Sequence, residues 1–478
     1  MVPPTGSSGD VIFWFRRDLR LADHPALRAA VVDAANRGAR VIPLFVVDPA
    51  LVAPSGANRL AYLYGCLRSL RDGGVPLVIR HGDPAVVLPV LAGERSAAAV
   101  YCTADFGPYG RRRDAATTSA LAGLGVALHA LDSPYVVAPG LVRKLDGAPF
   151  KVFTPFSKTW RQLAEGANTA ATVHATEVPW SRDADGAAIP DDPSGCGLRA
   201  ATIGEAAAHE RLERFAEHHL TRYDELRNDP SADATSRLSA DLKYGTLHPR
   251  QALSVLGRGS RAEDVFRSEI CWREFYADVL WHLPDSARHA LRPGMEAMRV
   301  DVGSAADDRL AAWCAGRTGY PLIDAGMRQL LAEGWMHNRV RMATASFLVK
   351  DLHIDWRRGA RYFMSQLVDG DLASNQHGWQ WTAGTGTDAA PYFRVFNPVS
   401  QGKKFDPLGD FVRRYVPELR HIVGPAVHEP WLAAADLFDG TPDYPSPIVE
   451  HAVERVEALT RYREVTARDG DQTTQDGG

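Results

Sequence analysis

Cysteine is scarce in this sequence and is never paired at close spacing. The five cysteines (Cys66, Cys102, Cys196, Cys271 and Cys314) are scattered over 478 residues without a CxxC motif. This pattern argues against a disulfide framework and a zinc site, and favours free thiols in a reducing compartment. Long apolar runs are also lacking, since none approaches the roughly 20 residues of a membrane-spanning helix. The first ten residues, MVPPTGSSGD, lack the basic start and apolar middle of a secretory signal. A cytoplasmic location is therefore expected.

An excess of positive charge is absent as well. The formal net charge of -4 and the pI near 6.5 do not announce a nucleic-acid-binding protein. Net charge describes solubility, however, and a local basic groove can hold phosphates on an acidic protein. At 478 residues the chain should form two or three domains. Eleven tryptophans are a high number for this length, and several of them stand in polar surroundings in the C-terminal half.

The N-terminal residues 10–132 alternate short apolar segments with helical stretches. The segments 11–15, 41–47, 77–79, 98–102 and 126–131 are typical of strands buried on both faces. Strand–helix alternation predicts an α/β domain with a parallel, Rossmann-like sheet and right-handed crossovers. No GxGxxG motif follows the first strand, which continues into RRDLR. A standard dinucleotide site is therefore not expected in this domain.

The rest of the chain reads differently. Residues 133–204 are rich in Pro, Gly, Asp and Ala, which predicts a long surface connector between domains. From 205 to 464, helical periodicity dominates and predicts an all-α domain. The last residues, 465–478, end in DGDQTTQDGG and are expected to be a disordered tail.

Two segments of the helical part each allow a functional and an ordinary interpretation. The segment TSRLS at 235–239 places small hydroxyls at a helix start, which suits a phosphate cradle or a simple N-cap. In the segment 269–276, Glu269, Trp272 and Tyr276 share one helix face. A carboxyl beside an aromatic plate suits a flat heterocycle with a hydrogen-bonding edge, but an amphipathic core helix would show the same pattern.

A third segment, GWMHNRVRM, begins at Gly334. Asn338, Arg341 and Met342 should project together from a helix, whereas Arg339 should point elsewhere. This face could bind a ligand or be a surface patch. His337 is interpreted as a structural histidine.

The fourth segment, DGDLASNQHGWQW, begins at Asp369. Asp371 can cap the helix that follows it. Asn375 and Trp379 share a face of that helix, whereas Trp381 is turned about 200° from Trp379. The two indoles must therefore serve different environments.

Several long stretches resemble the photolyase/cryptochrome family, and most closely the microbial class I cyclobutane pyrimidine dimer photolyases. They are FWFRRDLRLADHPAL, TSRLS, WREFY, GWMHNRVRM, ASFLVKDLHIDWRRGARYFMSQLVDGDLASNQHGWQW and GTDAAPYFRVFNPVSQGKKFD. The resemblance runs from about Asp10 to Arg463. It implies an N-terminal antenna domain, a helical domain that binds FAD and DNA, and a monomeric lyase. The implied activity is light-driven repair of cyclobutane pyrimidine dimers by electron transfer from excited FADH⁻.

The resemblance also implies residues for the flavin. Arg341 and Asp369 would pair beside the isoalloxazine, Asp371 would bond its polar edge, and Asn375 would face N5. An amide at N5 can both donate and accept, and a nearby Arg favours a negative flavin. The residues expected near the phosphates are Tyr223, Thr235, Ser236, Arg237, Leu238, Ser239 and Arg273.

For the damaged DNA, the resemblance implies a cavity that receives the two linked bases after they are flipped from the duplex. The residues matched to this cavity are Glu269, Trp272, Asn338, Met342 and Trp381. The positions matched to phosphate contacts are Arg227, Arg339, Arg394 and Lys403, which would supply a local basic groove.

The antenna chromophore is predicted to be 8-hydroxy-5-deazaflavin. Folate-binding members carry a Glu in the segment that reads Asp105–Arg111 here, and this chain has no acid at that position. Asp105 and Lys243 instead resemble the deazaflavin-binding members. The alternatives are methenyltetrahydrofolate, another flavin or an empty pocket, with Asp105 only capping a loop.

Two alternative activities are weighed within the same family. By the resemblance, (6-4) photolyases carry a His-His pair where this chain has His337-Asn338, and another His at the position of Arg341. A cryptochrome photoreceptor usually carries a long extension, whereas the tail here is short. Repair of cyclobutane dimers is therefore preferred.

The electron-transfer tryptophans follow the family pattern only in part. Trp379 resembles the inner member of the family's triad and Trp356 the middle one. The outer tryptophan is expected about ten residues before Trp313, but residues 299–304 read RVDVGS, with no aromatic. Photoreduction of oxidised flavin is therefore expected to be slow or to use a substitute donor.

Overall fold

The computed structural model describes residues 9–166, 169–170, 172–196, 202–257, 259–387, 393–433 and 443–475. The chain divides into two compact units. The first unit comprises Met1–Thr221 and Ser236–Pro284, and the second comprises Arg222–Thr235 and Asp285–Gly478. This division does not fall at residues 132 and 204, where the composition changes. The first unit also takes in the connector and several helices that follow it.

The first unit is built on a parallel sheet, as the sequence predicts. Five strands pair in the order β3-β2-β1-β4-β5, and every pairing is parallel. The strands are β1 (Val11–Phe15), β2 (Val41–Val47), β3 (Val78–His81), β4 (Ala99–Thr103) and β5 (Ala127–Leu131). All residues of β1 and β2 are buried, which explains their uninterrupted apolar sequences.

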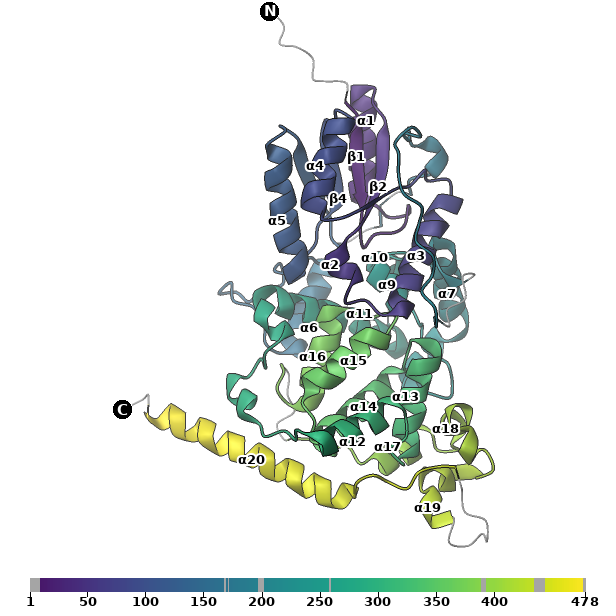
Figure 1. The fold of residues 1–478 in the computed structure, drawn as a ribbon, viewed down its shortest axis with the longest axis vertical. Helices are drawn as coiled ribbons and strands as arrows, with labels where there is room; N and C mark the ends of the chain where they lie inside the picture. Colours follow the sequence, from purple (N-terminus) through teal and green to yellow (C-terminus); the bar gives the residue numbers. More distant parts are fainter. Residues whose placement is uncertain are drawn as a thin grey trace, which may run out of the picture. The chain divides into compact units, whose positions relative to one another are not determined.

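Helices connect the strands of this sheet and cover it (Figure 1). They are α1 (Pro25–Arg37), α2 (Pro49–Val52), α3 (Ala57–Asp72), α4 (Pro84–Glu94) and α5 (Pro108–Ala122). Asp48 and Asp83 cap α2 and α4, each followed by a proline at the first helical position. The prediction that all five strands are buried on both faces is wrong for β5. It forms one edge of the sheet, and three of its five residues are exposed.

The connector contains a helix that the composition did not predict. Helix α6 (Phe153–Ala164) buries Phe156 and Trp160 and packs on α11 (Arg261–His282). Phe153, Phe156 and Trp160 follow at i, i+3 and i+7, so a helical period was present among the Pro-rich surroundings. The described part of the first unit also contains η1 (Ala175–Glu177), α7 (Glu205–His218), α9 (Ser239–Tyr244) and α10 (Pro249–Ser254), and η3 (Leu220–Arg222) begins in it.

The second unit is helical, as the sequence predicts. Its α-helices are α8 (Tyr223–Leu226), α12 (Ser304–Cys314), α13 (Pro321–Glu333), α14 (Asn338–Lys350), α15 (Trp356–Gln366), α16 (Leu372–Ala383), α17 (Pro398–Phe405), α18 (Asp410–Tyr415), α19 (Pro430–Ala433) and α20 (His451–Gln475). Short 3-10 helices include η5 (Pro293–Ala297), η6 (Pro417–Leu419) and η7 (Gly424–His428). Trp313, Phe347 and Phe363 lie at the centre of its core. No helix in the described part of the chain is long and apolar enough to cross a membrane.

Helix α20 extends into the expected tail. It runs to Gln475, past residue 464, and is the long yellow helix of Figure 1. Val465 is 3% exposed and packs with Ala290 and Met295, so this part of the chain does bury an apolar side chain. The expectation of a disordered tail is therefore wrong for residues 465–475. Residues 476–478 lie outside the described residues.

Candidate active site

The predicted face of α11 is present in the first unit. Glu269, Trp272 and Tyr276 are all half-buried, whereas Ile270, Cys271, Glu274 and Phe275 are buried. The rings of Trp272 and Tyr276 lie 5.5 Å apart. The helix therefore turns one face into the core and keeps a carboxyl beside an aromatic plate on another.

One contact on this face was missed by the sequence analysis. The ring of Phe153 stacks on Trp272 with a centroid distance of 3.7 Å and an interplanar angle of 5°. Phe153 is the first residue of α6, so it was hidden in the segment interpreted as a connector. The stack covers one face of the indole and fixes its plane, because two parallel rings in contact resist rotation.

Two acidic residues of α11, Glu274 and Asp278, hold the first part of the connector. Glu274 accepts hydrogen bonds from the backbone N–H groups of Val136 and Val137 and from Trp160 Nε1. Burial raises the pKa of Glu274 to about 7, against the opposing effect of these three donors. Asp278, one turn later, accepts from Gly140 N at 2.7 Å. Helix α11 thus orders the loop at 136–140.

The TSRLS segment is not an ordinary side-chain cap. Leu238 occupies the N-cap position of α9, and no side chain caps this helix. Arg237 has a φ of 51°, a backbone conformation that residues other than glycine rarely adopt. The structure assigns Thr235 to the second unit and Ser236–Ser239 to the first. The Thr235 hydroxyl is buried and has no hydrogen-bond partner among the described residues. A buried hydroxyl without a partner suits a ligand that supplies one.

Arg273 is already engaged by protein groups. Its guanidinium donates to Pro134 O at 3.1 Å and to Leu242 O at 2.9 Å, and it lies over the ring of Tyr135. These bonds tie α11 to α9 and to the start of the connector.

The predicted pair of Arg341 and Asp369 is present in the second unit. The guanidinium and the carboxylate form two bonds, from Nη1 to Oδ1 at 3.2 Å and from Nη2 to Oδ2 at 2.8 Å. Asp369 is buried and Arg341 is about one quarter exposed. Arg341 also donates to Met336 O at 2.7 Å, so its position is fixed from two sides. A bidentate pair of this kind holds a positive group in a defined plane.

Helix α16 carries the other predicted residues. Asp371 caps it by accepting from Ser374 N at 3.1 Å, as predicted. The amide nitrogen of Asn375 donates to Ala360 O at 3.2 Å and to Gln376 Oε1 at 2.9 Å. Because the nitrogen is committed to these acceptors, the carbonyl oxygen of Asn375 is the end that can accept from a ligand.

The two tryptophans of α16 occupy different environments, which confirms the prediction. Trp379 is 3% exposed and meets the rings of Phe363 at 5.0 Å and Trp313 at 6.1 Å. Trp381 is half-buried. One indole is therefore part of the helical core, and the other is accessible to a partner.

The start of α14 differs in one respect from the prediction. Asn338 is exposed, and Met342 lies half-buried one turn away. Arg339 was expected to point elsewhere, but its Nη1 lies 3.8 Å from the sulfur of Met342. A long guanidinium side chain can reach a residue three positions on, which a single-angle projection does not capture. His337 is structural, as predicted, because its Nδ1 accepts from Arg339 N at the helix start.

The residues expected to contact DNA phosphates have protein contacts as well. Arg339 donates to Asn228 Oδ1 at 2.7 Å, and Arg227 lies over Tyr223. The carbonyl of Arg394 accepts from the Lys350 ammonium, and Lys403 pairs with Glu429. The side chain of Tyr223 is buried. The charged groups of Arg227, Arg339 and Lys403 are thus held by neighbouring side chains, whereas Arg394 is held through its backbone carbonyl.

Asp105 and Lys243, expected at the antenna site, belong to the first unit. Asp105 accepts from Gly107 N at 3.1 Å and pairs with Arg113 at 3.1 Å. Burial opposes its ionisation, but Arg113, Arg16 and Arg17 together lower the pKa of Asp105 below the usual value. The backbone carbonyl of Lys243 accepts from Arg17 Nε at 3.3 Å. Asp105 is therefore a charged, structurally engaged carboxylate.

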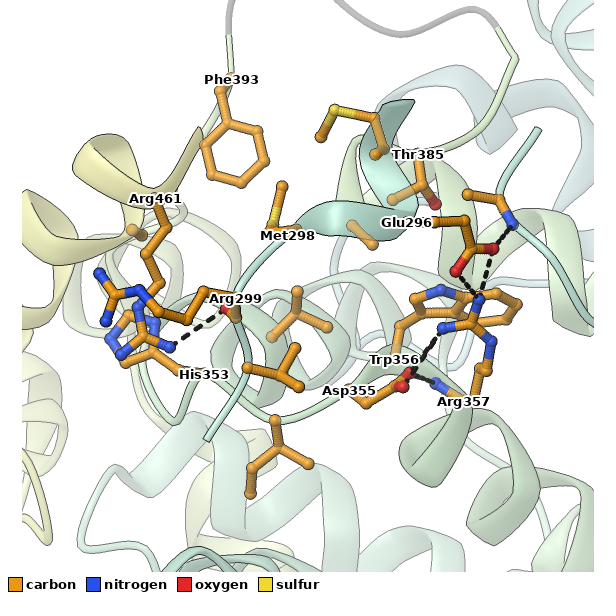
Figure 2. Close-up of a pocket in the computed structure, with 17 residues that line it drawn as sticks. Glu296, Met298, Arg299, His353, Asp355, Trp356, Arg357, Thr385, Phe393 and Arg461 are labelled. Carbon is orange, nitrogen blue, oxygen red and sulfur yellow. Dashed lines mark hydrogen bonds and ion pairs between the residues drawn. The ribbon is translucent and has the colours of Figure 1, made fainter. Parts of the chain in front are cut away.

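Trp356 borders a cavity of about 100 Å³ in the second unit (Figure 2). Arg299 and Val300 also line it, and they belong to the segment that lacks the expected aromatic. Phe393 and Thr385 complete part of the wall. Trp356 itself is 5% exposed. Among the described residues that line this cavity, Trp356 is the one tryptophan, so the expected third indole does not stand beside it there.

Comparison with known proteins agrees with this organisation. Residues 11–179 match the family described as DNA photolyase, and residues 266–464 match the FAD binding domain of DNA photolyase. The deoxyribodipyrimidine photo-lyase of Escherichia coli K12 is 40% identical over 469 residues, covering 94% of this chain and 98% of the relative. The chain belongs to the DNA photolyase family.

Solved structures show the same architecture. A bacterial class III photolyase from Agrobacterium tumefaciens has a TM-score of 0.87 at 34% identity, covering 98% of this chain and 99% of its own. A cryptochrome from Synechocystis has a TM-score of 0.83 at 28% identity, covering 94% and 98%. Repair enzymes and a cryptochrome thus share this fold, so the fold alone does not choose between them.

Proposed function

We propose that this protein repairs cyclobutane pyrimidine dimers in DNA with light, as a monomeric, FAD-dependent lyase acting in the cytoplasm. The observation that carries the proposal is the 40% identity to a deoxyribodipyrimidine photo-lyase, maintained over 94% of the chain. The face of Glu269 and Trp272 on α11 supports it, because a carboxyl beside an aromatic plate suits a flat base with polar edges.

The residues present fit FAD. The Thr235 hydroxyl is buried without a partner among the described residues, which suits a phosphate oxygen. Arg341, held in place by Asp369, offers a fixed positive charge for an anionic ring. When bound as FADH⁻, FAD supplies the light-excited electron that opens the cyclobutane ring and then receives it back. The protein contributes position and electrostatics.

The roles that we propose toward the flavin follow from these contacts. The carbonyl oxygen of Asn375 accepts a hydrogen bond from the N5 position, since its amide nitrogen is already used. Asp371 bonds the polar edge of the ring. The groups proposed on the phosphate side are Tyr223, Thr235, Ser236, Arg237, Leu238, Ser239 and Arg273.

The roles toward DNA use the remaining polar and aromatic groups. Photolyases take their target bases out of the duplex stack. Trp272 and Trp381 would stack on the flipped dimer, a contact worth about 1–3 kcal/mol per base in single-strand systems. Glu269 and Asn338 would bond its carbonyl and imide edges, with Met342 beside them. Arg227, Arg339, Arg394 and Lys403 would bind the backbone phosphates.

A light-dependent repair assay tests the proposal. Protein with fully reduced flavin is mixed with an oligonucleotide that carries one thymine dimer, and restored thymines are measured after illumination and in darkness. Repair that requires light is expected. A parallel oligonucleotide with a (6-4) lesion should remain unrepaired. This chain has Asn338 and Arg341 at the positions where the resemblance implies histidines in the (6-4) photolyases. Absence of any repair by the reduced protein would favour a photoreceptor.

Photoreduction of oxidised flavin is a separate property, and we propose that it is slow. Trp379 and Trp356 are the proposed inner and middle donors, and the cavity beside Trp356 holds no third indole among its described lining residues (Figure 2). Val300→Trp, which introduces an indole into the lining, should raise the rate, whereas Val300→Leu should not. Fast photoreduction in wild-type protein that survives Trp356→Phe would show that this series of donors is wrong.

A further inference from the structure

One surface loop of the first unit stands out for an apolar side chain held fully in solvent. Leu145 is 111% exposed relative to a reference residue, and Leu141 nearby is 63% exposed. A single exposed leucine is common on protein surfaces and indicates nothing by itself. The residues around Leu145, however, indicate that it has a function on this surface.

Leu145 stands at the tip of a closed hairpin, defined here as residues 141–150. Arg143 and Pro149 form an antiparallel bridge, and Lys144 N donates to Ala148 O at 2.9 Å. Gly147 N donates back to Lys144 O at 2.9 Å, and the Asp146 carboxylate accepts from Ala148 N. The tip is therefore ordered by its own hydrogen bonds, so Leu145 is presented to solvent by a defined turn.

The base of the hairpin is anchored in the unit. Val142 is 1% exposed, and the ring of Phe150 meets the edge of Phe156 on α6. Gly140, just before the hairpin, donates to Asp278 on α11 at 2.7 Å. A Cβ at Gly140 would lie 2.6 Å from the Trp281 ring nitrogen, so the chain passes close against α11 at this point. The hairpin is a fixed projection from α6 and α11.

The hairpin and the residues that follow it form a local basic surface. Residues 141–158 contain four basic side chains (Arg143, Lys144, Lys151 and Lys158) and one acidic side chain, Asp146. The Asp146 carboxylate is engaged with the backbone of the hairpin itself. The four cations are exposed, except that the Arg143 guanidinium also bonds Gly140 O and Gly147 O. This excess of positive charge contrasts with the net charge of -4 of the chain.

The basic residues adjoin, along the chain, the residue that stacks on the aromatic plate of α11. Lys151 is two residues before Phe153, and Phe153 stacks on Trp272 at 3.7 Å. A polyanion whose flipped base lies on Trp272 would therefore pass close to these lysines. An apolar side chain at the tip of a rigid basic projection is the arrangement with which proteins wedge into base steps of a duplex.

We propose that the hairpin 141–150 contacts the DNA duplex beside the lesion, with Lys144 and Lys151 on backbone phosphates and Leu145 packed against the bases that flank the flipped dimer. This inference rests on the proposed function. It adds a duplex-specific contact to the residues already assigned to the dimer and its phosphates. The partner is double-stranded DNA, since only a duplex holds the flanking bases in the paired, ordered steps into which a wedge can pack.

Equilibrium binding of the full-length holoprotein tests the proposal. Fluorescence anisotropy is measured on a duplex with one thymine dimer, on the same dimer-containing strand alone, and on an undamaged duplex. Leu145→Ser should weaken binding to the damaged duplex by roughly fivefold, the effect of losing part of a leucine's burial, and leave binding to the single strand unchanged. The control Leu124→Ser, at another exposed leucine of the first unit, should change neither.

The lysines are tested by salt dependence. For Lys144→Gln/Lys151→Gln, the slope of log K against log salt should fall by about 2 on the damaged and the undamaged duplex alike. The control Arg71→Gln, an exposed residue of α3, should leave the slope unchanged. Unaltered flavin absorbance and circular dichroism establish that the variants are folded.

The outcomes separate the hairpin from the proposed function. Wild-type affinity for duplex in Leu145→Ser, or an equal loss on duplex and single strand, overturns the wedge. An unchanged salt slope in the double lysine variant overturns the phosphate contacts. A wild-type protein without any preference for the dimer would instead contradict the proposed function, and in that case the salt slope still decides for or against the lysines.

Discussion

Among the side chains that we propose for the dimer site, Glu269 is the one whose role can be isolated most cleanly. It lies half-buried on α11, one turn before Trp272. Glu269→Ala should reduce the repair quantum yield and weaken dimer binding by roughly ten- to a hundredfold, since a hydrogen bond to a charged group contributes about 1.5–3 kcal/mol. Flavin content should not change. The yield is measured by actinometry on a thymine-dimer oligonucleotide.

Glu269→Gln serves as the matched variant. It keeps the size of the side chain and one hydrogen-bonding oxygen, so it should retain more of the yield than Glu269→Ala. A quantum yield that stays at the wild-type level in Glu269→Ala would remove this residue from the dimer site. Loss of flavin in either variant would point to a structural role.

Individual residues also show which side-chain contacts a sequence pattern can predict and which it cannot. The pairing of Arg341 with Asp369 was predicted from the family resemblance, and the structure shows it as a bidentate contact. The stack of Phe153 on Trp272 was not predicted. The two rings are more than a hundred positions apart, and no local period in a sequence connects them. Contacts of this kind depend on how helices pack, which a single sequence does not encode locally.

At the scale of elements, α15 packs closely against α16 at Gly359 of α15. A Cβ at Gly359 would lie 2.2 Å from Trp379 Cη2 and 2.4 Å from a methyl of Leu348. Gly359→Ala should therefore destabilise the protein by about 1–3 kcal/mol, because overpacking outweighs the gain in helix propensity. Urea unfolding measures the change.

Gly378 on α16 is the matched control. A Cβ there meets no heavy atom within 4 Å. Gly378→Ala should stabilise the protein by about 0.5–1 kcal/mol, since alanine restricts the unfolded chain and costs nothing sterically. If both substitutions changed stability equally, the close packing of Gly359 on Trp379 would not be the cause.

Helix α16 also carries a buried histidine, from which we expect the stability of the protein to depend on pH. His377 Nδ1 lies 2.8 Å from Ala373 O, and Nε2 lies 3.0 Å from the Ser286 hydroxyl. Burial lowers the pKa of His377 from 6.5 to about 4. Below about pH 6.5, His377 therefore binds a proton in the unfolded chain. In the folded chain it does not bind this proton until the pH falls to about 4. The free energy of unfolding should fall by about 3 kcal/mol over this interval as the pH decreases.

Urea unfolding at several pH values between 7 and 4 checks this expectation. His377→Gln should flatten the pH dependence, because the substituted amide does not titrate. The exposed His421→Gln is the control and should preserve the slope. An identical slope in wild-type protein and His377→Gln would assign the acid sensitivity to other groups.

At the scale of the whole molecule, the sequence predicts that an α/β part is followed by a helical part. It does not predict where the two compact units divide. The apolar strands and helical periods specified a parallel sheet followed by a helical part, and both are present. The compact units instead divide at residues 221–222, 235–236 and 284–285. Composition marks where the chain changes character, whereas a compact unit reflects which segments pack together. Helix α6 shows the difference, since it lies inside the Pro-rich connector and yet packs on α11.

The proposed antenna belongs to the scale of the whole molecule, and an absorption spectrum can identify it. Asp105 is an ionised carboxylate held by Arg113, which we propose to be part of a site for 8-hydroxy-5-deazaflavin together with Lys243. Freshly purified protein from a host that makes deazaflavin should show a strong band near the edge of the visible range. The action spectrum of repair should follow that band, because energy absorbed there must reach the flavin.

Asp105→Ala should remove the band and leave the flavin bands and flavin-driven repair in place. The control Asp33→Ala removes a carboxylate of the exposed pair with Arg37 on α1 and should keep the band. A wild-type spectrum with flavin bands alone would contradict the deazaflavin assignment, and a folate-like near-ultraviolet band would favour methenyltetrahydrofolate. If the band is present in Asp105→Ala as well, the carboxylate only holds its loop through Gly107 and Arg113, and the chromophore must be bound by other residues.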